Sequence, residues 1–337
     1  MKKSHSSRKR GGEEVGQTFD ELLSGDARSS EASAATAAEE GAIGMVIGLS
    51  SGRGRVFISG DEVDCLLPAA LAVRQKSALA VGDRVRIGPH DDIWRVTEVL
   101  PRTSVLARPD PLRPHMHRLV AANIDAVILV VTFQSPPLRP RLIDRYLIAI
   151  ERGRATPVIC VNKIDLIEGE ERASYLEALA PYRELGIQTV LCSARTGEGL
   201  ETLRSVVRGK VVALVGHSGV GKSSLLNALN EQLRLDTGGL LKRGKGAHTT
   251  TSSALYDFGD GTYLIDTPGI REFGLAGLDR KSLRDYFPEF ESPSESCRFN
   301  DCVHIHEPGC AVREEVEEGT IHPARYETYR RLYEDLS

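Results

Sequence analysis

An eight-residue segment, GHSGVGKS at 216–223, has the spacing of a phosphate-binding loop. Glycines in such a loop let backbone N–H groups close around phosphate oxygens, while Lys222 would reach the β- and γ-phosphates and Ser223 would hold Mg²⁺. The apolar run KVVALV precedes the segment and the helix-like run KSSLLNALN follows it, which is the context that this motif requires. A glycine-rich turn without a ligand is the alternative. The residues expected to contact the phosphates are Gly216, His217, Ser218, Gly219, Val220, Gly221, Lys222, Ser223 and Ser224.

A second phosphate motif, DTPG at 266–269, ends the apolar run TYLI. Phosphate-loop enzymes place a carboxylate after a strand to bind Mg²⁺, so we expect Asp266 to do this through water. The N–H group of Gly269 would contact the γ-phosphate. The tetrapeptide alone is a weak signal, because it also makes a good turn.

Two further motifs indicate which base is bound. In NKID, Asn162 can bond the N7 edge of a purine and the stem of Lys163 can lie over the ring. The Asp165 carboxylate would accept from the N1–H and 2-amino groups of guanine, which adenine lacks, so this residue selects guanine. In CSARTGEGL, Ser193 and the N–H of Ala194 would meet guanine O6.

The order of the motifs is unusual for a GTPase. The guanine motifs at 162–165 and 193–194 precede the phosphate loop at 216–223 and the carboxylate motif at 266–269, whereas ordinary GTPases have the phosphate loop first. The same sheet can form if the old termini are joined and new ones opened, because termini usually lie at the surface and often close together. The sequence therefore predicts a circularly permuted GTPase. The segment after DTPG then leads directly into the C-terminal region, so that loss of the γ-phosphate would act on that region.

The segment KRGKGAHTTTS at 242–252 lies between the two phosphate motifs, where the first switch belongs. Thr249 or Thr250 should bring a hydroxyl group to Mg²⁺, and we favour Thr250. The predicted Mg²⁺ ligands are Ser223, Thr250 and Asp266.

The residue that positions the attacking water is not the usual one. Many GTPases carry Gln directly after the carboxylate motif, but this chain has Ile270, which cannot hydrogen-bond water. We expect slow intrinsic hydrolysis, with His248 positioning the water once a partner orders the switch. An exposed loop histidine is the alternative. The predicted catalytic residues are His248 and Lys222.

Three cysteines and a histidine near the C-terminus have the spacing C-x4-C-x-H-x5-C: Cys297, Cys302, His304 and Cys310. Three thiolates and one imidazole match a closed tetrahedral zinc site, which leaves no open position for water and is therefore structural. Disulfides are the alternative, but they would leave one of these cysteines unpaired. His306 is a competing ligand on spacing alone.

The remaining pattern predicts a multidomain chain. Short segments that alternate apolar and polar residues over 41–112 are typical of a five-stranded, OB-type barrel. Continuous apolar runs alternate with amphipathic segments over 113–275, which indicates an α/β phosphate-loop domain with a parallel sheet covered on both faces. Residues 276–337 are charged and helical around the cysteines. The proline-rich stretch 107–118 is expected to be a linker.

Charge and composition exclude some classes of protein. The formal net charge is −4, and no apolar run approaches the roughly 20 residues of a membrane-spanning helix. The basic start MKKSHSSRKR has no apolar stretch behind it and is not a secretory signal, so we expect a cytoplasmic protein without membrane contact. Residues 1–40 are too poor in large apolar groups to offset ordering entropy and are expected to be disordered.

Basic residues outside the motifs could contact nucleic acid through phosphate charge, a solvated surface being the alternative. The first ten residues form one such group. Arginines of the barrel form another: Arg53, Arg55, Arg74, Arg84, Arg86, Arg95 and Arg102.

The order NKID, SARTGEGL, GHSGVGKSSLLN, HTTT and DTPG resembles the ribosome small-subunit-dependent GTPase A family (the RsgA/YjeQ type), as do the barrel and the cysteine-rich tail. The resemblance covers about residues 41–337. It implies a cytoplasmic, circularly permuted GTPase that binds the small ribosomal subunit, with its RNA and proteins, late in assembly and is stimulated by it. It also implies zinc and favours His304 over His306 as the ligand. The family usually has a basic residue where this chain has Ala247.

Two other functions stay open. A non-catalytic RNA-binding scaffold could use GTP as a structural ligand, which Ile270 favours and the intact Lys222, Ser223 and Asp266 oppose. An ATP-dependent enzyme is opposed by Asp165. No heptad pattern or isolated apolar face requires a second copy, so we expect a monomer.

Overall fold

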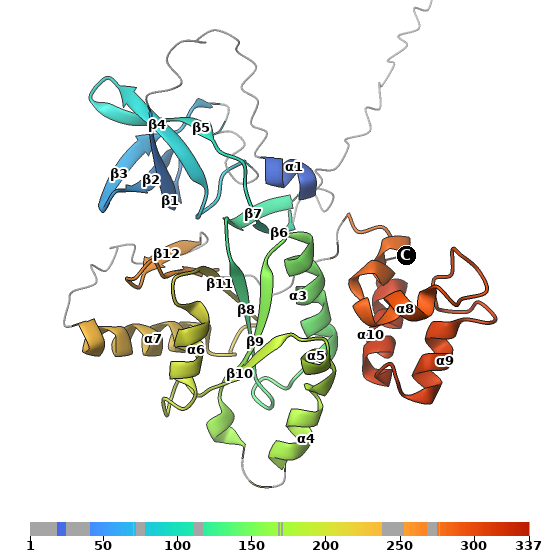
Figure 1. Cartoon of the computed structure of the whole chain (residues 1–337). Coiled ribbons are helices and arrows are strands. Elements are labelled where there is room, and N and C mark those ends of the chain that lie inside the picture. The colour runs from blue at the N-terminus through green and yellow to red at the C-terminus, as the bar shows by residue number, and fades with distance from the viewer. Residues whose placement is uncertain are drawn as a thin grey trace, which may run out of the picture.

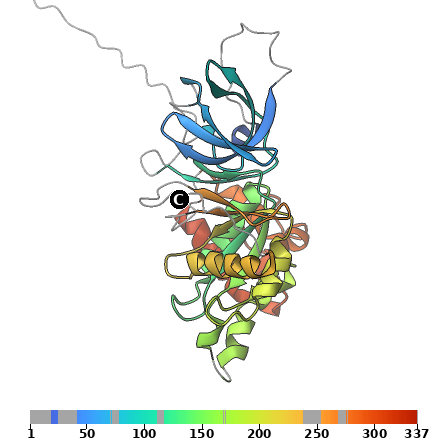
Figure 2. The same ribbon diagram turned by 90° about the vertical axis from the view of Figure 1, so that its left-hand side faces the viewer.

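The computed structural model describes residues 19–24, 41–69, 71, 78–110, 117–167, 169, 171–237, 253–267, 275 and 277–336. A barrel lies above a central sheet with helices on both sides, and a small helical module lies beside the sheet (Figure 1). Figure 2 shows the barrel stacked on the sheet from a second direction. Among the described residues, no helix combines the length and the hydrophobicity that crossing a membrane requires.

The N-terminal unit is a closed barrel with strand order β1-β2-β3-β5-β4, which confirms the predicted all-β fold. Its strands are β1 (Ala42–Ser50), β2 (Arg53–Ile58), β3 (Asp61–Leu66), β4 (Arg84–His90) and β5 (Ile93–Val99). Side chains alternate along each strand, and the inward ones, such as Val56, Val85 and Val96, form the barrel core.

An antiparallel ribbon connects the barrel to the central sheet. It pairs β6 (Val105–Pro109) with β7 (His117–Ala122). The prediction of a linker over 107–118 is therefore wrong at both of its ends, because residues 107–109 and 117–118 belong to these paired strands. At the base of the barrel, Gly82 has φ +91, and a Cβ there would lie 2.1 Å from the carbonyl oxygen of Ala122. This close approach ties the barrel to the ribbon.

The central sheet has six strands in the order β10-β9-β8-β11-β13-β12. They are β8 (Ala126–Val131), β9 (Thr156–Val161), β10 (Gln188–Leu191), β11 (Val211–Val215), β12 (Ala254–Asp257) and β13 (Tyr263–Asp266). All pairs are parallel except β12 with β13. All six residues of β8 are buried, as expected for a central strand covered on both faces.

Helices cover both faces of this sheet. One face packs against α3 (Pro140–Arg152) and α5 (Ala180–Glu184), with α4 (Glu171–Glu177) at its edge. The other face packs against α6 (Leu200–Val207) and α7 (Lys222–Thr237). A 3-10 turn, η1 (Ile164–Leu166), follows β9. The predicted α/β domain is thus confirmed.

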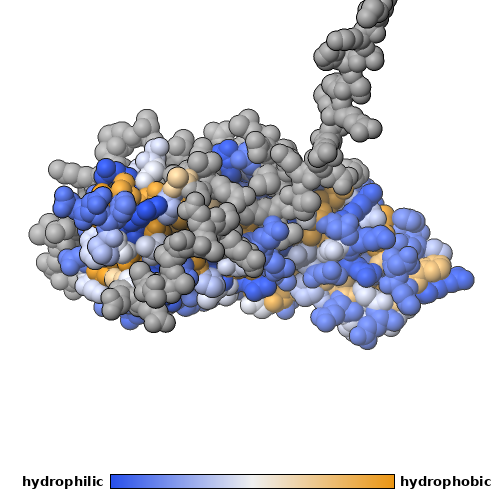
Figure 3. All heavy atoms as spheres, turned by 90° about the horizontal axis from the view of Figure 1, so that it is seen from above, coloured by the Kyte–Doolittle hydropathy of each residue, from blue (hydrophilic) through white to orange (hydrophobic). Residues whose placement is uncertain are grey.

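The C-terminal module is built from short helices around an aromatic core. They are η2 (Lys281–Tyr286), η3 (Pro288–Phe290), α8 (Glu291–Ser294), α9 (Ala311–Glu318) and α10 (Pro323–Asp335). Phe287, Phe290 and Tyr329 are buried together, and Ile148 of α3 joins their cluster. The module therefore packs directly on the central sheet domain, and the face of the module seen from above is mostly hydrophilic (Figure 3).

One helix lies inside the segment expected to be disordered. In α1 (Phe19–Ser24), Leu22 and Leu23 are buried against the ribbon. The expectation of disorder over 1–40 is therefore wrong for these six residues, because tertiary contacts offset their ordering entropy. The rest of that segment lies outside the described residues.

Candidate functional site

The phosphate-loop sequence occupies the turn between β11 and α7, as its spacing predicts. Gly216 has φ +143 and Gly221 has φ +94. A Cβ on Gly216 would lie 2.3 Å from the Val130 carbonyl oxygen, and one on Gly221 would lie 2.4 Å from Nδ2 of Asn162. Both positions therefore need glycine, for conformation and for space.

Lys222 begins α7 and turns its ammonium group back over the loop. Its Nζ donates to the carbonyl oxygens of Gly216 (2.7 Å) and His217 (3.1 Å). Burial lowers the pKa of Lys222, and the nearby Asp266 carboxylate opposes this shift. Burial likewise raises the pKa of Asp266, and Lys222 opposes it. The ammonium group of Lys222 and the carboxylate of Asp266 therefore lie near each other, where the phosphates of a ligand could replace the carbonyl partners of Lys222.

Asp266 reaches this position because β13 pairs in parallel with β11, so that Leu214 and Asp266 are opposite each other. The hydroxyl of Thr267 donates to the Leu214 carbonyl oxygen at 2.5 Å and fixes the end of β13. Ser223 and Ser224 are exposed in the first turn of α7. The strand end and the helix start thus bring Ser223 and Asp266 to the same edge of the sheet.

The NKID side chains connect three loops at this edge. Asn162 donates through Nδ2 to the Val220 carbonyl oxygen (2.9 Å) and accepts through Oδ1 from the Ala194 N–H (3.0 Å). Lys163 has φ +63, and its Nζ donates to the carbonyl oxygens of Ser135 (2.7 Å) and Gly219 (2.6 Å). The guanine motifs and the phosphate loop are therefore one connected structure, although 58 positions separate Asn162 from Val220.

Asp165 is held by two donors. Ser193 donates its hydroxyl to Oδ1, and Arg195 Nε donates to Oδ2 at 2.7 Å. The Ser193 hydrogen bond is the main cause that lowers the pKa of Asp165, and Arg195 adds to it. Neither Arg195 nor Ser135 is among the residues predicted from the sequence motifs. Arg195 could have been found, because it directly follows the Ser-Ala pair, whereas a backbone carbonyl such as that of Ser135 leaves no signal in the sequence.

Several predicted site residues lie outside the described residues. They are His248, Thr249, Thr250, Gly269 and Ile270. The roles predicted for them in Mg²⁺ binding, γ-phosphate contact and water positioning therefore stay predictions.

The C-terminal cluster brings together one ligand atom each from Cys297, Cys302, His304 and Cys310, all within 4.8 Å of one another. Nδ1 of His304 lies 3.6 Å from Sγ of Cys297 and 3.5 Å from Sγ of Cys310. Such a compact set of three sulfurs and one nitrogen fits a tetrahedral metal ion. The cluster could therefore hold a metal.

The surroundings of this cluster orient its histidine. Nε2 of His304 lies 3.1 Å from Oγ of Ser294, which leaves Nδ1 to face the sulfurs. His304 is buried, whereas His306 is exposed and lies outside the cluster. Glu307 accepts from the N–H groups of Val303 (2.9 Å) and Ile305 (3.1 Å) and so braces the turn that carries His304.

The barrel arginines do not form one accessible set. Arg102 is buried and paired with Asp83, so it is unavailable to a partner. Arg55 and Arg86 make partly exposed ion pairs with acidic residues of neighbouring strands. Arg53 and Arg84 are exposed, and Arg74 lies outside the described residues.

Comparison with known proteins supports a single family. A family model described as RsgA GTPase matches residues 99–276. The small ribosomal subunit biogenesis GTPase RsgA of Chlorobaculum parvum is 44% identical over 291 residues, which cover 82% of this chain and 92% of the relative. Its counterpart from Gemmatimonas aurantiaca is 43% identical over 262 residues, covering 77% of this chain and 84% of that one.

Solved structures agree. YjeQ from Thermotoga maritima has a TM-score of 0.71 at 33% identity, covering 88% of this chain and 98% of that chain. YloQ, described as a circularly permuted GTPase, has a TM-score of 0.68 at 27% identity and covers 88% of this chain and 96% of its own.

Proposed function

Because the chain belongs to the RsgA GTPase family, we propose that it hydrolyses GTP as a maturation factor of the small ribosomal subunit. One observation carries the nucleotide part of this proposal. Asn162 hydrogen-bonds both to Val220 of the phosphate loop and to Ala194 of the second guanine motif. The permuted motifs therefore assemble into one site that can hold the base and the phosphates of a single nucleotide.

In this proposal Asp165 recognises guanine and Lys222 the phosphates. The Asp165 carboxylate is kept ionised by its two donors and exchanges one of them for the N1–H and 2-amino groups of the base. Lys222 exchanges its carbonyl partners for the β- and γ-phosphates. The backbone from Gly216 to Ser224 surrounds the phosphates, and Ser193 and Ala194 face guanine O6.

Ser223, Thr250 and Asp266 would hold Mg²⁺ at the phosphates. The bound ion neutralises charge that develops on the transferred phosphoryl group. Gly269 would report the γ-phosphate through its N–H group. Asp266 suits this role. Burial raises its pKa and so disfavours the ionised carboxylate, and a bound cation would offset that effect.

We propose that the ion of the C-terminal cluster is zinc. Three sulfurs and one imidazole, mostly buried, suit Zn²⁺ better than the oxygen-binding Mg²⁺ or Ca²⁺. Burial raises the pKa of Cys302 to about 12 and lowers that of His304 to about 4, so an added cation would be needed to keep Cys302 as a thiolate. With all four positions supplied by protein, the role is structural.

His248 positions the attacking water in this proposal, since Ile270 cannot do so. We expect His248→Ala to abolish turnover stimulated by small subunits while GTP affinity is kept, measured as single-turnover hydrolysis and nucleotide binding. The control is Gln188→Ala, an exposed residue of the GTPase domain outside the barrel and the C-terminal module. Unchanged stimulated turnover in the His248 variant would contradict the assignment.

The domain limits proposed for this function are 41–112 for the barrel, 113–275 for the GTPase domain and 276–337 for the metal module. Barrel and module would contact ribosomal RNA and protein while GTP is bound, and hydrolysis to GDP would release a monomeric, cytoplasmic protein from the subunit.

A measurement of GTP turnover by the purified chain tests the whole proposal. It compares the chain with small ribosomal subunits, with large subunits and with neither. Strong stimulation by small subunits alone is the expected result. Equal and slow turnover in all three conditions would instead favour the scaffold that uses GTP as a structural ligand, which the replacement of Gln by Ile270 keeps open.

A further inference from the structure

The short helix α1 lies in the seam between the barrel, the ribbon and the end of α3 (Figure 1). A helix of six residues is too short to be stable alone, so its surroundings must stabilise it. Leu22 and Leu23 are 0% and 5% exposed and pack against Val105, Ala107 and Leu119 of the ribbon. The two leucines of α1 are thus covered by other parts of the chain, and Phe19 is partly covered.

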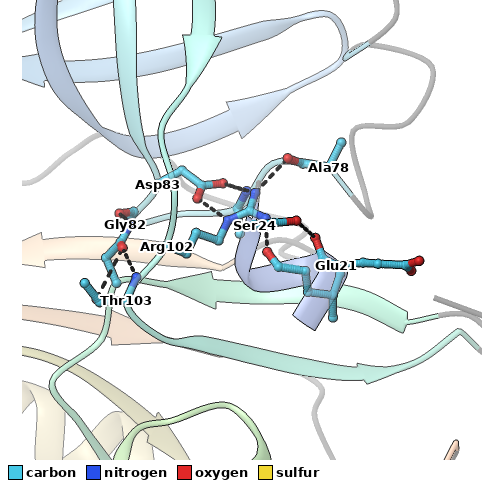
Figure 4. Close-up of polar contacts among 10 residues, drawn as sticks. Glu21, Ser24, Ala78, Gly82, Asp83, Arg102 and Thr103 are labelled. Atoms are coloured by element: carbon cyan, nitrogen blue, oxygen red, sulfur yellow. Dashed lines mark hydrogen bonds and ion pairs between the residues drawn. The ribbon is translucent and has the colours of Figure 1, made fainter. Parts of the chain in front are cut away.

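The C-terminal end of α1 is capped by the barrel (Figure 4). The last carbonyl groups of a helix lack partners within it. Here the Leu23 carbonyl accepts from the N–H of Arg102 at 3.0 Å, and the Leu22 carbonyl accepts from the guanidinium of the same residue. That guanidinium is fixed by Asp83 at 2.6 and 2.9 Å and by the Ala78 carbonyl at 2.8 Å. The Arg102 and Asp83 side chains are almost fully buried, so the cap is rigid.

The other end of α1 contacts the GTPase domain. The guanidinium of Arg152, at the end of α3, lies 4.4 Å from the centre of the Phe19 ring. The same guanidinium donates to the Gly277 carbonyl oxygen at 3.3 Å, where the C-terminal module begins. The centres of the Phe19 and His117 rings lie 5.1 Å apart, and the ring planes meet at 71°.

We propose that this seam is a docking groove for a short helix, and that its occupant is the chain's own Phe19–Ser24 segment. Phe19, Leu22 and Leu23 lie at spacings that share one helix face, and the groove supplies a cation for the ring, an apolar wall for the leucines and an arginine for the final carbonyls. The docked helix holds the barrel, the ribbon and the end of α3 in one orientation. This role is independent of GTP hydrolysis.

Amide hydrogen exchange of the full chain tests this docking. Leu22→Asp puts a carboxylate at a site with no exposure, which should expel α1. We expect amides of Arg102 and of β6 and β7 to exchange at least tenfold faster, equivalent to about 1.4 kcal/mol of lost protection. The strands β8, β9 and β11 should be unaffected. Ser24→Ala is the matched control, because among the described residues that hydroxyl donates to the Glu21 carbonyl in the same helix.

A peptide in trans separates docking from general destabilisation. A synthetic peptide of residues 15–28 should restore slow exchange in the Leu22→Asp chain in a saturable way, and the same peptide carrying Leu22→Asp should not. Unchanged exchange at the seam in the variant, or a fast seam that the peptide leaves fast, overturns the proposal. If the sheet strands also exchange faster, Leu22→Ala replaces the first variant, and the same peptide test decides.

Discussion

Replacing Arg325 with Met should weaken the attachment of the C-terminal module by about 3 to 5 kcal/mol. Arg325, on α10, makes a bidentate pair with Glu289 of the module at 2.7 and 3.1 Å and a second pair with Asp144 on α3 of the GTPase domain. The Arg325 and Asp144 side chains are 5% and 1% exposed. Removing one partner of such a pair leaves the other charge buried without compensation, which is the source of the cost. The expected change in the opening equilibrium of the module is about 150-fold to 5,000-fold.

The size of this effect should depend on pH. Burial raises the pKa of Asp144 to about 6, against the opposing charge of Arg325, so the pair is ionised at neutral pH. Without the guanidinium, the pKa of Asp144 in the folded variant rises further above its usual value of 3.8. A carboxyl whose pKa is higher in the folded state stabilises that state increasingly as the pH falls through the folded pKa. The variant begins to gain this stability at a higher pH than the wild type, so the difference between them should shrink from pH 8 towards about 6 and then level off.

Urea unfolding combined with amide exchange in α10 measures the effect for the module separately from the barrel and sheet. Arg330→Met is the matched control on the same helix, since its ion pair with Glu327 spans 3.5 Å between side chains that are nearly half exposed. That control should cost less than about 1 kcal/mol. The double variant Asp144→Asn, Arg325→Met should recover part of the loss. A cost for Arg325→Met no greater than that of the control, or one that is the same at pH 8 and pH 6, would refute the assignment of a buried, charged anchor.

Two further predictions concern the nucleotide and the metal. Asp165→Asn should weaken GTP binding by about a hundredfold or more and favour xanthosine triphosphate, because the amide no longer accepts from both guanine donors. Competition binding with GTP, ATP and xanthosine triphosphate measures this preference. An unchanged preference for GTP would show that another residue selects the base. A strong chelator should release one metal ion per chain and make the cluster cysteines reactive to a thiol reagent, while the cysteines with no exposure stay unreactive until the chain unfolds. Metal analysis, and thiol titration with and without denaturant, measure these two effects. Equal reactivity of all six cysteines after chelation would contradict the prediction. The cluster cysteines are Cys297, Cys302 and Cys310, and the unexposed ones are Cys65, Cys160 and Cys192.

The arrangement of the candidate nucleotide site could be predicted from sequence, because the chemistry proposed for it needs fixed residue types at fixed spacings next to strands. Gly216 and Gly221 illustrate this, since no other residue type fits their backbone conformation and their neighbours. The parallel sheet could be predicted with it, because the runs that carry Asn162, Ser193 and Asp266 had to meet at one edge, whereas the order of its strands came from the structure. The cysteine cluster could be predicted equally well, although spacing in the sequence alone did not decide between His304 and His306 as its fourth ligand.

Features that depend on distant partners could not be predicted in this way. Arg102 has the same appearance in the sequence as the exposed arginines of the barrel, and only folding shows that Asp83 buries it. The composition of residues 1–40 hides α1, because two leucines and a phenylalanine in one turn are outweighed by the polar residues around them. Whether such a helix forms depends on the groove that receives it, to which described residues between 78 and 110 and between 117 and 154 contribute.

The helix α3 contacts each of the other units of the chain. Before it begins, the Ser135 carbonyl accepts from Lys163 of the guanine motif. Its middle carries Asp144, the partner of the C-terminal module, and its end carries Arg152, which meets both α1 and the start of that module. The Gly153 carbonyl then accepts from β6 of the ribbon at 2.8 Å. A rotation of α3 against the sheet would therefore displace the ribbon and the C-terminal module together, so this helix is one route by which a change at the nucleotide site could act on both.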